Sequence, residues 1–139
     1  MTLEEQLDII RKLCEEDNTY PPMAYCFVRD SVHKAIEALI KDEKKKNPFA
    51  DEVEPDISGN NLCYFFRDTL LARFGPCAID VLDTWNIKKT NDFGKIVYKL
   101  ISVKILGKSE KDSIDDFDNV YDFVKEFVLP YKLGRNTPA

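Results

Sequence analysis

Apolar residues recur at three- and four-residue intervals through the middle of the chain, which is the spacing of one face of an α-helix. This pattern predicts three helices between residues 58 and 106, with apolar stripes over 62–70, 79–85 and 93–101. The stripes consist of Leu62, Phe65, Phe66, Thr69 and Leu70, then Ile79, Leu82 and Trp85, then Phe93, Ile96, Val97, Leu100 and Ile101. We expect this segment to form a core on which the remainder of the chain packs.

Residues that start and stop helices lie between the stripes. Ser58 and Thr90 have side-chain oxygens that accept hydrogen bonds from free N–H groups, so we expect them to cap the first and third helices. Gly75 suits the left-handed position after a helix, and Pro76 suits the first turn of the next one. Asn86 also tolerates a left-handed backbone, which predicts the end of the second helix there. The arrangement is similar to a helix-turn-helix.

The third helix is amphipathic, with an apolar face and a polar face. Asp92 lies in its first turn, where the helix dipole stabilises a negative charge. Gly94 lacks a side chain, so we expect a neighbouring element to approach the helix closely at this point. The residues predicted to point outward are Asn91, Lys95, Tyr98, Lys99 and Ser102.

Two helices are predicted before the core, within residues 1–46. Thr2 and Glu5 have the spacing of a capping box and open a helix that extends to about Glu15. The residues expected to face inward from this helix are Leu3, Leu7, Ile10 and Cys14. A second helix starts at Pro22, because proline is tolerated in a first helical turn.

The last part of this second helix, residues 41–46, has no apolar stripe, so we expect it to lie in solvent. The acidic, proline-containing residues 47–57 then predict a loop.

The segment after the core, residues 107–133, allows two interpretations. Ser109 with Asp112, and Ser113 with Asp116, have capping-box spacing, which predicts a turn and a short helix. The alternation of apolar residues over 117–123 predicts instead a strand paired with residues 103–106, a β-hairpin like that of a winged helix.

The fold class predicted is thus a single, mostly α-helical domain over residues 1–133, with the hairpin left open. Residues 134–139 are expected to form a loose tail.

Several short blocks carry a resemblance to a known family. Those in the core are Ile57-Ser58-Gly59, Arg73-Phe74-Gly75-Pro76, Val81-Leu82-Asp83-Thr84-Trp85, Thr90-Asn91-Asp92-Phe93-Gly94 and Ile96-Val97-Tyr98. The outer blocks are Tyr20-Pro21-Pro22, Ala24-Tyr25, Phe27-Val28, 108–113, Asp116-Phe117 and Tyr121-Asp122-Phe123. Over residues 20–127 they resemble a family of conserved hypothetical bacterial proteins, known mainly from planctomycete and verrucomicrobial genomes.

The chain departs from that family at Val103 and Lys104, where the family tends to have a glycine, and residues 44–55 form a longer insert. The family has no assigned activity. The resemblance therefore implies a conserved domain and no particular chemistry.

The composition fits a folded, cytosolic domain. A chain of 139 residues with 44% hydrophobic residues is long enough to bury one core. No apolar run approaches the length of a membrane helix, and the acidic start of the chain is unlike a signal peptide. The cysteines have no Cys-x-x-Cys pair, so we expect reduced thiols and no zinc site. They are Cys14, Cys26, Cys63 and Cys77.

Positive charge is concentrated in residues 86–111, which contain seven lysines against Asp92 and Glu110, a local charge of +5. Because the whole chain carries −5, the remainder carries −10. One interpretation is a winged-helix-like nucleic-acid-binding protein. In it, the turn before the third helix contacts phosphates, and the third helix lies in a groove of the nucleic acid. The candidate binding residues are Lys88, Lys89, Asn91, Lys95, Tyr98, Lys99 and Ser102.

The interpretation that we favour is that this lysine face is solvated, or docks onto the acidic segment 112–122. A negative net charge weakens attraction to a polyanion. The presumed recognition helix also lacks arginine, the commonest reader of guanine.

Catalytic chemistry has weak support in the sequence. His33 is the only histidine and lies on a polar flank of the long helix. The aspartates of residues 112–122 lack the central glycine and final glutamate of a calcium loop, so we expect no metal and no cofactor. Trp85 and the phenylalanines at 65, 66, 74 and 93 either line a small-molecule pocket or, as we favour, belong to the core.

The sequence therefore predicts a non-enzymatic cytosolic protein-interaction module that binds a protein partner or self-associates through its asymmetric charged surface. Two alternatives stay open. One is nucleic-acid binding through the Lys88–Lys111 surface, and the other is small-molecule binding beside Trp85.

Overall fold

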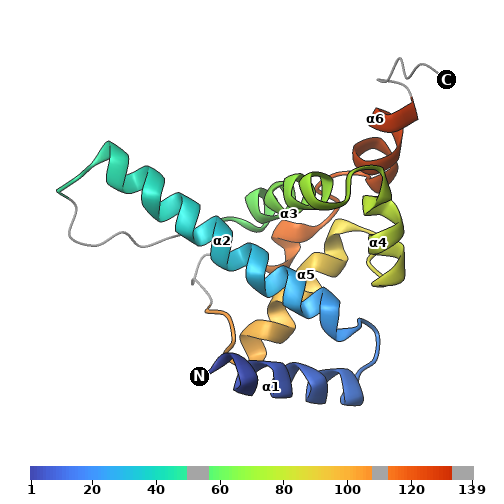
Figure 1. The fold of residues 1–139 in the computed structure, drawn as a ribbon, viewed down its shortest axis with the longest axis horizontal. Coiled ribbons are helices and arrows are strands. Elements are labelled where there is room, and N and C mark those ends of the chain that lie inside the picture. Colours follow the sequence, from blue (N-terminus) through green and yellow to red (C-terminus); the bar gives the residue numbers. More distant parts are fainter. Residues whose placement is uncertain (50–56, 108–112, 133–139) are drawn as a thin grey trace.

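The computed structural model describes residues 1–49, 57–107 and 113–132, which form helices and turns with no β-strand among them. The helices are α1 (Leu3–Glu16), α2 (Pro22–Lys46), α3 (Gly59–Phe74), η1 (Gly75–Cys77), α4 (Ala78–Thr84), α5 (Thr90–Ser102), η2 (Ile114–Phe117), η3 (Val124–Val128) and α6 (Leu129–Lys132). Of these, η1 and η2 are 3-10 helices and η3 is a π-helical turn. The prediction of a single, mostly α-helical domain is confirmed (Figure 1).

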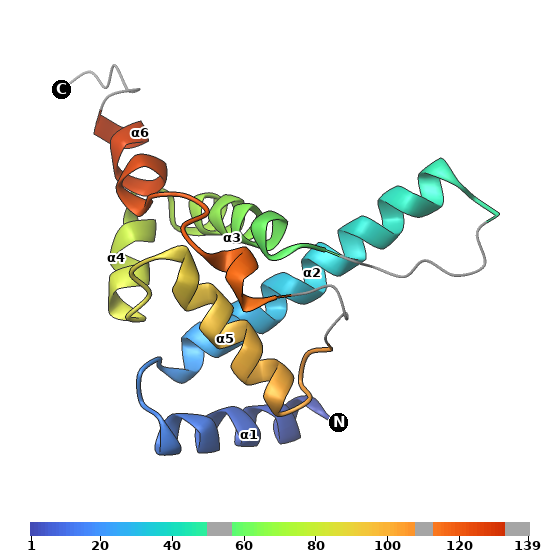
Figure 2. The same cartoon turned by 180° about the vertical axis from the view of Figure 1, so that it is seen from behind.

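Helix α5 occupies the middle of the molecule and contacts α2, α3 and η2 (Figures 1 and 2). The predicted apolar stripe of this helix faces inward, and Phe93, Ile96 and Leu100 have no exposed surface. The Phe93 ring centroid lies 4.9 Å from that of Phe66 in α3 and 6.0 Å from that of Phe123 before η3. One aromatic cluster thus joins the two halves of the chain, as expected from the area that such side chains bury.

The predicted start and stop signals of α1 and α3 are confirmed. Thr2 caps α1, because its Oγ1 accepts a hydrogen bond from the Glu5 N–H at 3.1 Å. Ser58 caps α3 through the Asn61 N–H at 3.2 Å. Gly75 follows α3 with a φ of 51°, a backbone angle that favours glycine.

Helices α4 and α5 end in the same kind of left-handed turn. After α4, Asn86 has a φ of 61°, and the N–H groups of Asn86 and Ile87 donate to carbonyls of the last turn at 3.0 and 2.9 Å. After α5, Lys104 has a φ of 64°, and the N–H groups of Lys104 and Ile105 make the equivalent bonds at 3.0 Å. The predicted role of Asn86 is confirmed, and Lys104 holds a position that glycine usually takes.

Helix η2 packs against α3 and α5 where each has a glycine. A Cβ on Gly94 would lie 2.8 Å from the Cβ of Phe117, and a Cβ on Gly59 would lie 2.8 Å from the Cε1 of the same residue. Phe117 is correspondingly buried. The predicted close approach at Gly94 is confirmed, and the element that approaches is η2.

The β-hairpin alternative is excluded for the described residues. Residues 103–106 form the turn that ends α5, and Ser113 caps η2 by accepting from the Asp115 N–H at 3.2 Å. The helical interpretation of Ser113 and Asp116 is therefore confirmed. The physical reason is that Phe117 inserts at the two glycines, so the following apolar side chains meet helices instead of a second strand.

Other predictions fall outside the described residues or need correction. The pair Ser109 and Asp112, the tail 134–139 and residues 50–56 of the predicted loop lie outside them. The prediction that Leu3 faces inward is wrong, because this side chain is 60% exposed in the peripheral first turn of α1. Ile10 is fully buried as predicted.

The last part of α2 projects from the body of the molecule (Figures 1 and 2). Ala35 is the last buried residue of α2, and from residue 37 to residue 49 none is buried. We call residues 37–49 the arm. Ten helical residues extend about 15 Å at 1.5 Å per residue, so the arm stands well clear of the core. The predicted exposure of residues 41–46 is confirmed.

Replacing Lys104 with glycine is expected to stabilise the protein by about 0.5–1 kcal/mol, because a left-handed backbone is costly for a residue with a Cβ. Urea unfolding followed by Trp85 fluorescence measures this change. The control Lys99→Gly lies inside α5 and should instead destabilise by about 1 kcal/mol. Unchanged or lower stability of Lys104→Gly would contradict the turn described here.

Gly94→Ala is expected to destabilise the protein by about 1–2 kcal/mol, because the new methyl group overlaps Phe117 and this cost exceeds the gain in helix propensity. The control Gly107→Ala has no atom within 4 Å of the new Cβ and should be close to neutral. If the overlap is the cause, Gly94→Ala should lose most of its cost in a Phe117→Ala background. Urea unfolding of the wild type, Gly94→Ala, Phe117→Ala and the double variant gives the free energies of this double-mutant cycle.

Candidate functional site

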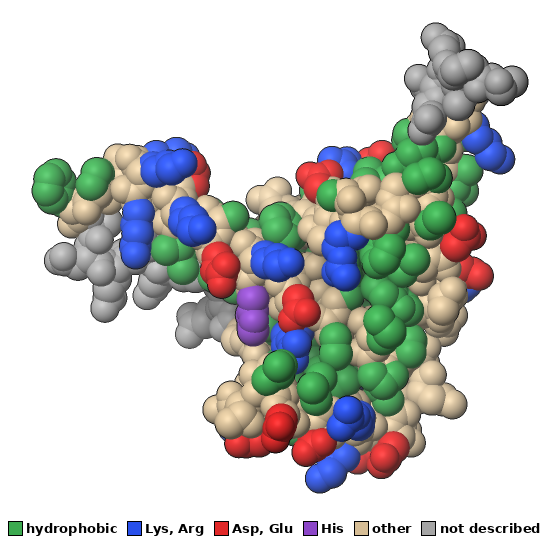
Figure 3. Space-filling view, viewed as in Figure 1, with side chains coloured by type: hydrophobic (Ala, Val, Ile, Leu, Met, Phe, Trp, Pro, Cys, Tyr) green, Lys and Arg blue, Asp and Glu red, His purple; other side chains and the backbone are tan. Residues whose placement is uncertain are grey.

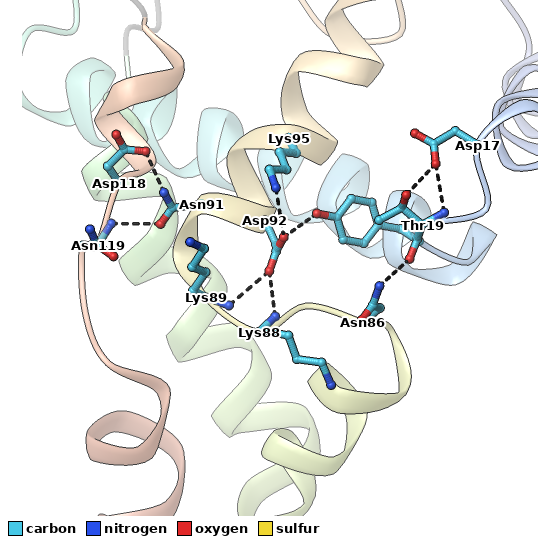
Figure 4. A network of polar contacts seen from close by, with 11 residues as sticks. Asp17, Thr19, Asn86, Lys88, Lys89, Asn91, Asp92, Lys95, Asp118 and Asn119 are labelled. Carbon is cyan, nitrogen blue, oxygen red and sulfur yellow. Dashed lines mark hydrogen bonds and ion pairs between the residues drawn. The ribbon is translucent and has the colours of Figure 1, made fainter.

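The first turn of α5 contains a buried carboxylate that holds three parts of the chain together. Asp92 is 8% exposed, and its Oδ1 accepts a hydrogen bond from the Tyr20 hydroxyl at 2.5 Å. Its Oδ2 accepts from the N–H groups of Lys88 and Lys89 at 2.8 and 3.2 Å (Figure 4). Asp92 therefore caps α5 and ties the α1–α2 corner to the core. Burial, with the bond to this carboxylate, raises the pKa of Tyr20, so the phenol remains the donor.

The α1–α2 corner has a second attachment beside this one. The Asn86 side-chain amide donates to the Thr19 carbonyl at 3.0 Å. The Thr19 hydroxyl and N–H in turn donate to Asp17, which lowers the pKa of that carboxyl group. The turn that ends α4 thus contacts the corner that precedes α2, although the two are far apart in sequence.

The predicted lysine face meets carboxylates of its own chain and stays open to solvent. Lys88 forms an ion pair with Asp83. Lys95 Nζ lies 3.9 Å from Asp92 Oδ1, and its side chain is 60% exposed. The Lys99 side chain is 47% exposed and its Nζ lies 3.9 Å from Asp17 Oδ2. None of these carboxylates belongs to segment 112–122, so of the two alternatives that we favour, a solvated face and docking onto that segment, the three lysines show the first.

Two residues predicted to point outward from α5 have internal roles instead. Asn91 donates to Asp118 Oδ1 at 2.8 Å and accepts from the Asn119 N–H at 3.1 Å (Figure 4). Tyr98 is half-buried, and its ring meets Phe117 edge-on at 6.5 Å. The cause is the C-terminal segment, which packs along this flank of α5. Asn91 and Tyr98 are therefore not part of an open groove.

The prediction that Thr90 caps α5 is also wrong. Thr90 is the first residue of the helix and fully buried, while Asp92 supplies the cap. Its hydroxyl donates to the Phe117 carbonyl at 2.6 Å and accepts from the Val120 N–H at 3.0 Å. Thr90 thus anchors the C-terminal segment.

What remains of the predicted site is a narrow exposed strip. It contains Lys88, Lys89, Lys95 and Lys99, together with Ser102, whose hydroxyl donates to the Lys99 carbonyl at 2.6 Å. Two other lysines of the predicted surface, 108 and 111, lie outside the described residues.

The thiols are poorly suited to act as nucleophiles. Burial raises the pKa of Cys63 to about 12 and also raises the pKa of Cys14 and of Cys26. Because the thiolate is the reactive form, these three side chains are held in the less reactive state. Cys77 is exposed, and the four thiols are free.

The aspartates of segment 112–122 and Trp85 were weighed in the sequence as a metal site and a ligand pocket, and the structure describes other contacts for them. No group of three or more His, Cys, Asp or Glu side chains within the described residues is placed to hold a metal ion. Asp118 instead accepts from Asn91, and Asp122 accepts from the Lys125 N–H at 3.2 Å. Trp85 is 7% exposed and belongs to the core, as we favoured. Its ring centroid lies 5.2 Å from that of Phe27 and 6.2 Å from that of Phe74.

The structure reveals two surface features that are not predicted as sites from the sequence. One is the arm, whose lysines and apolar tip are visible in Figure 3. The other is a groove of about 320 Å³ between α4 and the start of η3. Asp80 and Asp83 lie three residues apart on α4 and so share a face of the helix. This spacing is the one feature of the sequence that indicates an acidic surface here. Its opposite wall, residues 122–124, comes from a segment about 40 residues later in the sequence.

No protein-family model matches the chain, and neither the curated proteins nor the solved structures compared with it gave a match. The resemblance to the bacterial family therefore stays a prediction. In the part of the chain that the structure describes, no helix is both long and apolar enough to cross a bilayer.

Tyr20→Phe is expected to destabilise the protein by about 1–3 kcal/mol, because it removes a hydrogen bond from a buried carboxylate without changing the ring. Chemical denaturation gives the free energy of unfolding. The matched control Tyr64→Phe removes a hydroxyl from a partly exposed ring and should change stability by less than about 0.5 kcal/mol. An equal effect of both substitutions would argue against a structural role for the Asp92 network.

Proposed function

We propose that this chain is a non-enzymatic, cytosolic protein-interaction module, and that the arm is the element that contacts a protein partner. One observation carries the proposal. The arm, a charged helix end followed by an exposed aromatic residue, projects from an otherwise packed core. Phe49 is 92% exposed, the highest value among the large hydrophobic side chains described. Figure 3 shows lysines along the arm and hydrophobic side chains at its far end.

The energetics of the arm support this role. A helical segment that buries little surface is marginally stable, because fixing its backbone costs free energy that packing does not repay. Leu39 and Ile40 are half-buried at the base of the arm, and the ion pair between Lys46 and Asp42, at 3.2 Å, supports its end. Contact with a partner would supply the burial that the arm lacks alone.

The arm also indicates the chemistry of the partner. Residues 37–49 contain four lysines and three acids, a net charge of +1, and three of the lysines (44, 45 and 46) shortly precede the Phe49 ring. Aromatic side chains in pockets dominate many interfaces, and surrounding charges steer the partners together. The arm therefore suits a protein surface with an apolar pocket and carboxylates at its edge.

The lysine strip on α5 and the turn before it is the weaker candidate. Each of Lys88, Lys95 and Lys99 has a carboxylate of the same chain within 4 Å, which reduces its attraction for an external anion. If α5 lay in the groove of a nucleic acid, Asn91 and Tyr98 would also have to contact it. Both side chains instead contact the C-terminal segment. We therefore favour a protein partner over a nucleic acid. The free thiols fit a reducing compartment, which supports a cytosolic location.

The test compares the tagged full-length chain with two variants. The arm variant carries Lys44→Gln, Lys45→Gln, Lys46→Gln and Phe49→Ser. Affinity capture from extract of the organism, treated with nuclease and quantified by mass spectrometry, should show proteins that the wild type enriches and that the arm variant loses by roughly tenfold or more. Copies of the chain itself are excluded from the comparison.

A control variant makes the same three lysine changes elsewhere and replaces an exposed leucine where the arm variant replaces Phe49. It carries Lys12→Gln, Lys104→Gln, Lys132→Gln and Leu3→Ser, all at exposed positions. It should capture what the wild type captures, and circular dichroism should show that both variants are folded. The same proteins captured by the arm variant and the wild type would refute the proposal. Loss of all enrichment on nuclease treatment would indicate nucleic-acid binding instead.

A further inference from the structure

The groove between α4 and η3 combines apolar walls with an acidic rim. The wall residues are Ile79, Phe123 and Val124, and the rim residues are Asp80, Asp83 and Asp122. Val124 is 50% exposed despite its apolar side chain. The volume of the groove, about 320 Å³, is at the lower end of the range for ligand pockets, so the groove suits one inserted side chain rather than a whole helix.

The rim of the groove carries negative charge that the chain itself does not balance. Lys88 pairs with Asp83, whereas the Asp80 carboxylate makes no hydrogen bond or ion pair with any described residue. Asp122 accepts a backbone N–H but meets no cation among the residues described. Three carboxylates and one ammonium group leave a net charge of −2. An ammonium group from outside would make charge-assisted hydrogen bonds here.

The arm has the complementary chemistry. Lys44, Lys45 and Lys46 are exposed, and they lie within five residues of the exposed Phe49 ring. An aromatic ring could insert between the apolar walls while the lysines beside it face the carboxylates. Such a contact combines burial of an aromatic side chain with complementary charge. Within the described residues, Lys44, Lys45, Lys46 and Phe49 therefore match the groove in charge and polarity, while the four acids of residues 51–56 lie outside the described part of the chain.

The arm and the groove of one molecule cannot meet. The end of α2 that forms the arm lies at one end of the molecule, and α4 with the segment after η2 lies at the other, as both views show (Figures 1 and 2). The residues that line the groove belong to this second end. Contact between them must therefore join different copies. Such a contact is heterologous, so its repetition produces an open chain or a ring rather than a twofold dimer.

We propose that the groove receives the arm of a second copy of this chain, with Phe49 against Val124 and Phe123 and the arm lysines on the carboxylate rim. This inference rests on the proposed function, because both use the arm as the contact element. The interface is small, so association is weak and depends on protein concentration and on salt.

The first experiment is sedimentation of the purified full chain over a series of concentrations. The average mass of the wild type and of the control variant should rise with concentration, and the rise should shrink at high salt. The arm variant should remain monomeric. The groove variant, Asp80→Lys with Asp83→Lys, should do the same, and since both positions are exposed its melting temperature should stay near that of the wild type.

The decisive experiment mixes the two monomeric variants. The arm variant keeps an intact groove and the groove variant keeps an intact arm, so the mixture should form a complex of two copies and nothing larger. A mixture that stays monomeric, or a wild type that is monomeric at every concentration, overturns the inference. If the wild type is monomeric while the arm variant still loses its captured partner, self-association is wrong and the proposed function stands.

Discussion

The carboxylate of Asp92 is the interaction on which the arrangement of this domain depends. A buried charge is costly unless it is hydrogen-bonded, and Asp92 accepts one bond from a phenol and two from backbone N–H groups. These bonds start α5, shape the turn before it and attach the α1–α2 corner. Two residues earlier, Thr90 uses both hydrogen-bonding capacities of its hydroxyl to attach the C-terminal segment. The first turn of α5 thus joins the N-terminal and C-terminal parts of the chain.

This arrangement has a consequence for the charged surface. A helix that holds both ends of a domain has few side chains left for an outside partner, and the C-terminal segment covers the flank that carries Asn91 and Tyr98. The lysines that remain on α5 lie among carboxylates of the same chain. Within the described residues, the groups without partners are found instead at the periphery. The arm buries little of its surface, and the groove has three carboxylates but only one lysine.

The packing of η2 shows how small residues decide which segments can meet. At Gly59 and Gly94 the absence of a Cβ lets the side chains of Asp116 and Phe117 in η2 lie directly on two helices. Close packing of this kind does not accommodate added side-chain atoms, because protein interiors have little free volume. The left-handed turn at Lys104 shows the opposite tolerance. An exposed residue there bears a strained backbone that the surrounding hydrogen bonds maintain.

The sequence by itself determined the features that depend on neighbours within a few residues. Helical periodicity, the caps at Thr2, Ser58 and Ser113, and the turns at Gly75 and Asn86 all follow from local sterics and hydrogen bonds. Only the tertiary structure decided the partners of Tyr20 and Thr90, which lie 72 and 27 residues away. It also decided which lysines meet an aspartate, that the arm projects, and that α4 and η3 enclose a groove. The physical reason is that these contacts depend on how helices pack, and one-dimensional spacing does not record which helix faces which.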